Sequence, residues 1–348
     1  MTDAPKAWLV RSGGGGESEN FALEHGFAAG GGFNEIPNLT EVVSRDEVKE
    51  IVRVALPHLS NAAVANYTSQ LWSMRRVRPG DLIVLPMKTT SQIALGTVKD
   101  GYKYREDDDP RKRHVISVDW QRTDVPRTAI KQDLLYSLGA AQTVCQITRN
   151  DGAWRLQKIM EAGNDPGARD ETVESMEAED ADATDAAEST FDLERIGRDQ
   201  IQAYVSQEFA GHGLERLVAA VLSAEGFFTQ QASRGADGGI DIFAGQGPLG
   251  LDSPRLIVQV KSSPAPVDAK VVRELHGVLT THGAEQALLV AWGGVNKVAR
   301  QELRNQFFRV RVWDAEDLLN AVLRNYERLS EEIRADLPLK RIWSLVEE

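Results

Sequence analysis

Two residues of opposite charge, Asp241 and Lys261, lie in neighbouring apolar segments of the chain. The segments read GGIDIFAG and LIVQVKSS, and their β-branched, apolar composition is typical of buried strands. A buried strand rarely carries a charge, because removing an unpaired charge from water is unfavourable. Side chains alternate along a strand, so Gln259 shares one face with Lys261. If the two strands pair, Asp241, Gln259 and Lys261 can converge on one point.

Glu215 lies in the preceding segment GLERLVAAVL, whose apolar residues recur with the spacing of a helix. It stands at the edge of the apolar stripe, where its carboxylate can point over the sheet into the same cluster. The four side chains suit phosphodiester hydrolysis, because Asp241 and Gln259 can supply oxygen ligands to Mg²⁺, with Mn²⁺ as the alternative ion. Such an ion neutralises charge on the scissile phosphate and helps to deprotonate water. Lys261 can then steady the attacking water and the developing negative charge.

The structural alternative is an ion pair between Asp241 and Lys261 that does no more than join two strands. A buried ion pair is often no more stabilising than an apolar pair of similar volume. Stability alone is therefore a poor reason for the two charges, and the sequence favours a catalytic cluster.

Helix and strand signals alternate around this cluster. Two β-rich segments follow the helix GLERLVAAVL, and after them come a helix in VDAKVVRELHGVLTTHG, a strand in QALLVAWGG and a helix in NKVARQELRNQF. The segment FRVRVWDAEDLLNAVLRNY then reads as a strand that runs into a helix. This order predicts an α/β domain with a mixed central sheet.

The first 150 residues carry many short strand signals instead, among them AWLVR, GDLIVLP, SQIALGTVKDGYKY and HVISVDW. Two helices are expected between them. One is SRDEVKEIVRVAL, which begins with a capping box of Ser44 and Glu47, and the other is NAAVANYTSQLWSMRR. These signals predict a small, mostly β domain that forms a barrel with covering helices.

A strongly acidic segment separates the two parts. Residues 151–200 contain 15 acidic and 5 basic residues, so most of the chain's net charge of −12 falls there. The stretch 161–192 has few large apolar residues and cannot bury enough surface to offset its ordering entropy. The predicted organisation is an N-terminal domain at 1–155, a flexible acidic linker at 156–192 and a catalytic domain at 193–348.

The composition excludes several classes of protein. No apolar run approaches the roughly 20 residues that a membrane helix needs, and the N-terminus lacks the layout of a signal peptide. The single cysteine, Cys145, excludes an internal disulfide and a cysteine-based zinc cluster. We therefore expect a cytoplasmic protein without membrane contact.

The motifs GLERLV, GADGGIDI, GPLG and LIVQVKSS together resemble the catalytic domain of Mrr-type restriction endonucleases. This branch of the PD-(D/E)xK nuclease superfamily often has QxK in place of (D/E)xK, and the resemblance spans about residues 214–303. It implies a restriction-endonuclease-like fold. It makes Asp241 the metal-binding acid and places Gln259 at the second-acid position. It makes Lys261 the catalytic lysine and Glu215 the helix glutamate. The chain departs from the pattern at Leu214, where an aromatic residue is common, and at Ser262, where a basic residue is common.

Residues 6–150 resemble the PUA/EVE-like domains found beside restriction nucleases, through AWLVRSGGGG, GFAAGGGF, VRPGDLIVLP, IALGTVKDGYKY and RHVISVDW. Phe33 stands where such domains usually have Trp. The resemblance implies binding of a flipped or unpaired, often modified base between aromatic walls. The candidate walls are Phe33, Trp72 and Tyr102. The alternative is that Phe33 and Trp72 belong to the core of the domain, with Trp8 and Trp120.

Two short basic strings in the same part could follow a phosphate backbone. The candidate phosphate contacts are Arg75, Arg76, Arg111 and Arg113. Short clusters of this kind are also common in solvated loops that bind nothing, and the sequence leaves both interpretations open.

These observations predict a Mg²⁺-dependent endonuclease of the Mrr-like type IV restriction class that restricts foreign DNA, including DNA with modified bases. The expected partner is double-stranded DNA. Cutting both strands with one active site per chain suggests a homo-oligomer, either a dimer or a tetramer. Two alternatives stay open. One is a nucleic-acid-binding protein that keeps the fold without cutting, and the other is a nuclease that acts on RNA.

Overall fold

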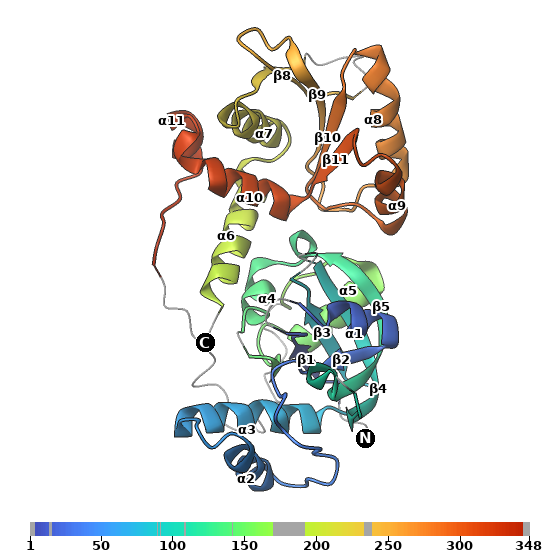
Figure 1. Ribbon diagram of the computed structural model, residues 1–348, viewed down its shortest axis with the longest axis vertical. Coiled ribbons are helices and arrows are strands. Elements are labelled where there is room, and N and C mark those ends of the chain that lie inside the picture. The colour runs from blue at the N-terminus through green and yellow to red at the C-terminus, as the bar shows by residue number, and fades with distance from the viewer. Residues whose placement is uncertain are drawn as a thin grey trace. The chain divides into compact units, whose positions relative to one another are not determined.

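The computed structural model describes residues 4–13, 16–88, 90, 92–107, 109–140, 142–169, 192–232 and 239–343. The chain divides into two compact units, Met1–Gly197 and Arg198–Glu348, which are called unit 1 and unit 2 below (Figure 1). No helix among the described residues is long and apolar enough to cross a membrane.

Six strands of unit 1 form one sheet in the order β2-β5-β4-β3-β1-β6. Their bounds are β1 Ala7–Val10, β2 Phe27–Ala29, β3 Leu82–Pro86, β4 Gln92–Tyr104, β5 His114–Pro126 and β6 Val144–Gln146. β1 and β3 pair in parallel, and the other neighbours are antiparallel. Among the described strands, β2 and β6 each have a single neighbour. The described sheet is therefore open at two edges, and the closed barrel expected from the sequence is not found.

Five α-helices of unit 1 cover this sheet. They are α1 Glu19–His25, α2 Arg45–Ala55, α3 Asn61–Arg76, α4 Gln132–Ser137 and α5 Gly152–Ala162, with short 3-10 turns at Pro110–Lys112 and Arg127–Ala129. The sheet separates two apolar cores, one on each face, as two consecutive residues of β1 show. Trp8 packs with α2 and α3, whereas Leu9 packs with α4 and α5 on the other face. Strand alternation thus buries apolar side chains on both faces of the sheet.

Helix α5 extends the folded part of unit 1 beyond residue 155, where the sequence places the end of the N-terminal domain. Leu156 and Ile159 are 1% and 0% exposed and belong to the core that contains Leu9. Asp165 is also buried. Residues 156–169, which the sequence analysis assigned to the linker, are therefore folded in the structure.

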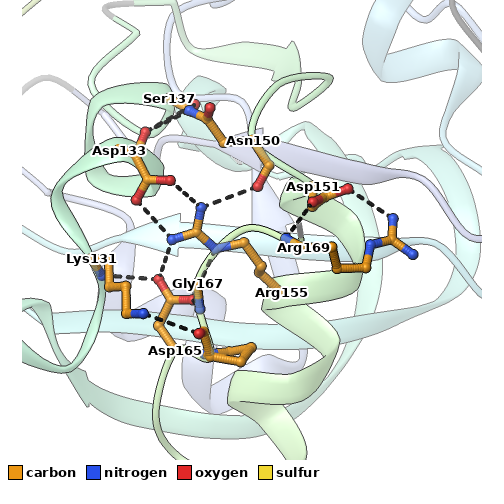
Figure 2. Close-up of polar contacts among 10 residues, drawn as sticks. Lys131, Asp133, Ser137, Asn150, Asp151, Arg155, Asp165, Gly167 and Arg169 are labelled. Atoms are coloured by element: carbon orange, nitrogen blue, oxygen red, sulfur yellow. Dashed lines mark hydrogen bonds and ion pairs between the residues drawn. The ribbon is translucent and has the colours of Figure 1, made fainter. Parts of the chain in front are cut away.

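Arg155 holds this segment in place (Figure 2). Its buried guanidinium donates to both carboxylate oxygens of Asp133 and both of Asp165, at distances between 2.6 and 2.9 Å. Asp165 also accepts hydrogen bonds from the backbone N–H groups of Lys131 and Gly167. Burial alone would raise the pKa of Asp165, but the hydrogen bonds from Arg155 and the two amides together hold it below its usual value. The network ties the chain after α5 to the start of α4.

Five strands of unit 2 form a mixed sheet in the order β11-β10-β9-β8-β7. Their bounds are β7 Phe228–Gln231, β8 Ile242–Gln246, β9 Asp252–Lys261, β10 Gln286–Ala291 and β11 Val310–Trp313. The strands β9, β10 and β11 are parallel, whereas β7, β8 and β9 are antiparallel. The α/β architecture with a mixed central sheet is thus confirmed.

Helices cover both faces of the unit 2 sheet. Their bounds are α6 Leu193–Glu208, which begins in unit 1, α7 His212–Ala224, α8 Ala269–Thr281, α9 Lys297–Asn305, α10 Ala315–Asn325 and α11 Glu331–Asp336, with a 3-10 turn at Tyr326–Arg328. α7 and α10 pack on one face in a core with Val258 and Val260 of β9. α8 and α9 pack on the other face in a core with Ile257. Gln259 and Lys261 alternate with Val258 and Val260, so they belong to the face that carries Ile257.

Candidate active site

Asp241 lies immediately before β8, one residue ahead of the pair Ile242↔Val258 that begins the β8–β9 ladder. Its backbone N–H donates to the carbonyl of Val258 at 2.8 Å. Its side-chain Oδ2 accepts from the backbone N–H of Val260 at 2.6 Å. The carboxylate therefore continues the ladder by one hydrogen bond beyond the end of the strand, which fixes its position against β9.

The environment of Asp241 opposes its ionisation. Burial raises the pKa of this carboxyl above its usual value, the hydrogen bond from Val260 lowers it, and the nearby charge of Glu215 raises it again. Lys261 and His212 favour the ionised form by a smaller amount. A partly buried carboxylate beside a second carboxylate is a common place for a cation, because the cation removes both penalties.

Gln259 contributes a buried polar group without a partner. Its side chain is 6% exposed, and its Oε1 accepts no hydrogen bond from any residue that the structure describes. The amide packs closely on Gly239, where a Cβ would lie 2.6 Å from Nε2 of Gln259. Gly239 has φ +82°, which disfavours any residue with a side chain. Gly239 thus leaves the room that the Gln259 amide occupies. A buried acceptor without a hydrogen-bond partner among the described residues is a candidate to bind a ligand.

Glu215 reaches the same region from the first turn of α7, on the opposite face of the sheet. Its two carboxylate oxygens lie 2.9 and 3.0 Å from Nδ1 of His212, the first residue of that helix. The charge of Glu215 is felt at Asp241, where it raises the pKa. The sequence analysis did not single out His212. The spacing His-x-x-Glu at the start of a helix is the signal that could have found it, because residues three apart share one helix face.

Lys261 is the last residue of β9 and is partly buried. Its side chain makes no hydrogen bond or ion pair with residues in the described ranges, but its charge lowers the pKa of Asp241. The structural alternative required a direct Asp241–Lys261 ion pair, and no such pair is found among these residues. The ammonium group is therefore not neutralised by a contacting carboxylate in the part of the unit that the structure describes.

The donor set fits one small divalent cation. No group of three or more His, Cys, Asp or Glu side chains within the described residues could hold a metal on its own. Mg²⁺ does not need such a group, since it is usually bound by one or two carboxylates and keeps several waters. Oδ1 of Asp241 and Oε1 of Gln259, neither of which has a hydrogen-bond partner among the described residues, are two hard oxygen donors. These residues therefore fit Mg²⁺ or Mn²⁺.

Of the three aromatic residues predicted to bind a base, Phe33 and Tyr102 lie in one core cluster of unit 1. Phe33 is 2% exposed and contacts the edges of Tyr67 and His114 with ring planes at 75° and 80°. Tyr102 is 8% exposed. Trp72 packs against the same cluster but is only partly buried. Of the three rings, Trp72 has the most surface left for a ligand.

Tyr102 holds together a chain of hydrogen bonds. Its hydroxyl accepts from the backbone N–H of Leu39 at 3.2 Å and donates to Nδ1 of His114 at 2.9 Å. Nε2 of His114 lies 2.9 Å from the carbonyl of Ile36, so that nitrogen carries the proton. Burial raises the pKa of Tyr102 to about 12 and lowers the pKa of His114. The neutral Tyr102–His114 pair thus fastens the loop that carries Ile36 and Leu39 onto β4 and β5.

The four arginines predicted to contact phosphate differ in the contacts that their side chains already make within the protein. Arg75 donates to the carbonyls of Thr40 and Val42, and its guanidinium lies 5.1 Å from the ring centroid of Tyr102. Arg111 makes two hydrogen bonds to Asp109, at 2.9 and 3.0 Å. Arg113 donates to the carbonyl of Asp107. Arg76 is partly buried. Arg111 and Arg113 therefore make contacts within their own loop, and Arg75 binds the backbone of the segment before α2.

The comparisons with known proteins agree with the division into two units. The restriction endonuclease family Mrr_cat matches residues 206–322. The resemblance proposed from the C-terminal motifs is confirmed by this match, which includes all four residues of the cluster. A family described as a domain of unknown function, DUF8426, matches residues 8–148. The PUA/EVE-like resemblance of the N-terminal part is not confirmed.

Seven chains of solved structures are similar to this chain, and three of them are described here. The protein of unknown function AF1548 is 19% identical with a TM-score of 0.26, over 36% of this chain and 77% of that one. The MspJI restriction endonuclease in complex with a 27-mer oligonucleotide is 13% identical with a TM-score of 0.32, and the match covers 74% of this chain and 64% of that chain. The DNA modification-dependent restriction endonuclease AspBHI is 15% identical with a TM-score of 0.33, and the match covers 81% of this chain and 75% of that chain. No curated protein matches the sequence.

Proposed function

We propose that the chain is a Mg²⁺-dependent endonuclease that hydrolyses phosphodiester bonds in foreign double-stranded DNA. The observation that carries the proposal is the cluster inside the region that matches the restriction endonuclease family. There, the carboxylate of Asp241 is fixed against β9 at Val260, and the amide oxygen of the preceding residue, Gln259, is buried without a hydrogen-bond partner among the described residues. Lys261 follows Gln259 on the same face of the strand.

Each residue of the cluster has a distinct role in this proposal. Asp241 and Gln259 would hold the cation through Oδ1 and Oε1. Bound there, the cation would neutralise charge on the scissile phosphate and lower the pKa of a coordinated water. Lys261 donates hydrogen bonds to the attacking water and to the phosphate oxygen on which charge develops. Glu215, held by His212, adds the second negative charge that favours a cation beside Asp241.

Base recognition by unit 1 is the second part of the proposal. A base that is flipped out of the duplex gains stacking energy on an aromatic ring, about 1–3 kcal/mol per base. Trp72 supports this role because it is only partly buried, and it packs against the cluster that contains Phe33 and Tyr102. Methylated or hydroxymethylated DNA would then be preferred to unmodified DNA.

Assembly and location complete the proposal. One cluster per chain cuts one strand, so cleavage of both strands in one event needs at least two chains. We propose a dimer or tetramer in the cytoplasm, where foreign DNA arrives. Light scattering of the purified protein tests the assembly, and a monomer at all concentrations contradicts it.

The decisive experiment compares cleavage of matched unmodified, methylated and hydroxymethylated duplexes in the presence of Mg²⁺ or Mn²⁺. Lys261→Ala should reduce the cleavage rate at least about 100-fold, the size of loss seen when one group that stabilises transition-state charge is removed. Lys270→Ala is the matched control, because Lys270 is exposed and pairs with Glu274 on α8. Binding without cleavage of any DNA would assign the chain to the non-catalytic binders. Preferential cleavage of RNA in competition would overturn the DNA substrate.

A further inference from the structure

Helix α9 carries a basic face that the cluster does not use. Lys297, Arg300 and Arg304 are spaced three and four residues apart, so they lie on one side of the helix. All three are exposed. The opposite side is apolar and packs on α8, with Ala299 fully buried. Glu302, the acidic residue of this helix, points away from the basic face and pairs with Arg273 of α8 at 3.4 Å.

The three charges on this face have no acidic partner within the described residues. Many other cations of unit 2 do have one, as Arg216, Arg255 and Arg324 show with Asp336, Glu285 and Glu225, respectively. Further basic residues follow α9. Arg309 is exposed, and the guanidinium of Arg311 lies 3.7 Å above the ring of Phe307. An unneutralised row of cations on a rigid helix is the electrostatic footprint that a phosphate backbone needs.

The basic face begins at the end of the sheet that carries the cluster. β9 and β10 are parallel and Lys261 pairs with Ala291, so the carboxyl ends of both strands lie together. The chain after Ala291 stays there, since the backbone N–H of Trp292 donates to the carbonyl of Lys261 at 2.9 Å. Asn296, five residues after Ala291, caps α9 through its side chain. Lys297, the first residue of α9, thus starts the row near the end of the sheet where Lys261 finishes β9.

We propose that the exposed face of α9 binds the sugar–phosphate backbone of duplex DNA and leads it from the cluster across unit 2. This inference rests on the proposed nuclease function and names the surface that holds its substrate. From Lys297 to Arg304 the helix rises about 10 Å, which matches the axial advance of about three phosphates on one strand. The contact is to phosphates, so it gives affinity without sequence preference.

The test measures DNA binding by the full chain in the presence of a chelator, which prevents metal-dependent cleavage. The variant Lys297→Gln/Arg300→Gln/Arg304→Gln keeps unbranched polar side chains of similar helix propensity but removes three charges. Binding of a duplex of about 30 base pairs is followed between about 50 and 200 mM salt. Each lost phosphate contact should reduce the slope of log affinity against log salt by about one unit, so the variant should lose two to three units. At low salt its affinity should fall by at least about tenfold, equally for all sequences.

The matched control is Arg255→Gln/Lys270→Gln/Arg324→Gln, which makes the same change in net charge at residues already paired with carboxylates. It should bind with nearly the slope of the unchanged chain. The single variant Arg300→Glu, at an exposed position, should weaken binding as well and guards against misfolding of the triple variant. Thermal unfolding curves of all variants should coincide.

The outcomes separate the two proposals. If the unchanged chain cuts and binds DNA but the α9 variant binds like its control, the α9 inference fails and the nuclease function stands. If the unchanged chain neither binds nor cuts DNA, both fail. If the α9 variant loses self-association while its DNA affinity is unchanged, the face is a contact between copies of this chain, and the inference is overturned.

Discussion

Asp241 and Gln259 are unfavourable residues for the stability of the sheet in which they lie. Gln259 buries an amide oxygen that has no hydrogen-bond partner among the described residues, and Asp241 has a raised pKa because burial opposes its charge. An unsatisfied buried acceptor costs about 1–3 kcal/mol. Both features are explained if the residues hold a cation, since the ligand supplies the missing partner. The sequence could predict these residue identities, because an acid and a QxK motif in apolar strands are visible without a structure.

The pKa of Asp241 predicts how stability responds when its charge is removed. When a carboxyl has a higher pKa in the folded state than in the unfolded state, its ionisation destabilises the fold. The loss of stability begins as the pH rises past the unfolded-state pKa and is complete above the folded-state pKa. Asp241→Asn should therefore raise the free energy of unfolding at pH 7, because the amide still accepts from Val260 but carries no charge. Urea denaturation with a chelator measures this difference, which should shrink toward pH 3. An equal gain at both pH values would contradict the assignment, and cleavage should be lost throughout.

Tyr102 should be required for stability through its hydroxyl. Tyr102→Phe removes the acceptor for Leu39 and the donor for His114, and both partners are then left buried. We expect a loss of about 1–3 kcal/mol in the free energy of unfolding of unit 1. Tyr67→Phe is the control, because the Tyr67 hydroxyl has no hydrogen bond to a described residue, and it should change stability by less than about 0.5 kcal/mol. Equal effects of the two substitutions would show that the Tyr102 hydroxyl is dispensable.

At the scale of elements, local signals were sufficient for some helices and strands and insufficient for others. Ser44 caps α2 as expected, and the strand that carries Gln259 and Lys261 alternates as expected. The sequence assigned part of helix α5 to the linker, because the acidic composition of the segment after it outweighed the apolar residues of the helix. The partners that fix this segment, Asp133 and Asp165, act through Arg155 across 22 and 10 positions. Such contacts, like the open edges of the unit 1 sheet, depend on tertiary packing that no local pattern contains.

Arg155 should be the main electrostatic support of the segment that follows α5. Arg155→Leu leaves Asp165 charged and buried without its guanidinium, a change that typically costs about 3–5 kcal/mol. Arg169→Leu is the matched control. Arg169 is exposed and pairs with Asp151 at the surface, so it should change stability by less than about 1 kcal/mol. Chemical denaturation of both variants checks this, and comparable losses would show that the buried network adds little.

At the scale of the whole molecule, the chain carries two sets of cores. The apolar clusters of unit 1 include Trp8 and Leu9, and those of unit 2 include Leu217 and Ile257. All four residues of the proposed catalytic cluster belong to unit 2. The sequence predicted this division from the change in charge and in strand pattern between the two parts. The role of each part is less accessible, because an aromatic residue of a core and one that stacks on a base have the same local pattern.

Two sets of cores predict two unfolding transitions. Leu217 is fully buried on α7, and Leu217→Ala should cost about 2–5 kcal/mol. It should shift the transition of unit 2 and leave that of unit 1 in place, whereas Arg155→Leu should do the reverse. Calorimetry of the full chain measures both. A single transition that both substitutions move together would show that the units unfold as one.

The hydrogen bond between Asp241 and Val260 makes the proposed chemistry inseparable from sheet formation. One oxygen of this carboxylate extends the ladder between β8 and β9, and the other is the oxygen proposed to bind the cation. A chain emerging from the ribosome, or one that has partly unfolded, has no β8–β9 ladder and therefore no assembled cutting centre. Damaged or unfinished copies would be harmless to the genome of the cell that makes them. Residual cleavage in denaturant should accordingly follow the folded fraction of unit 2 point by point.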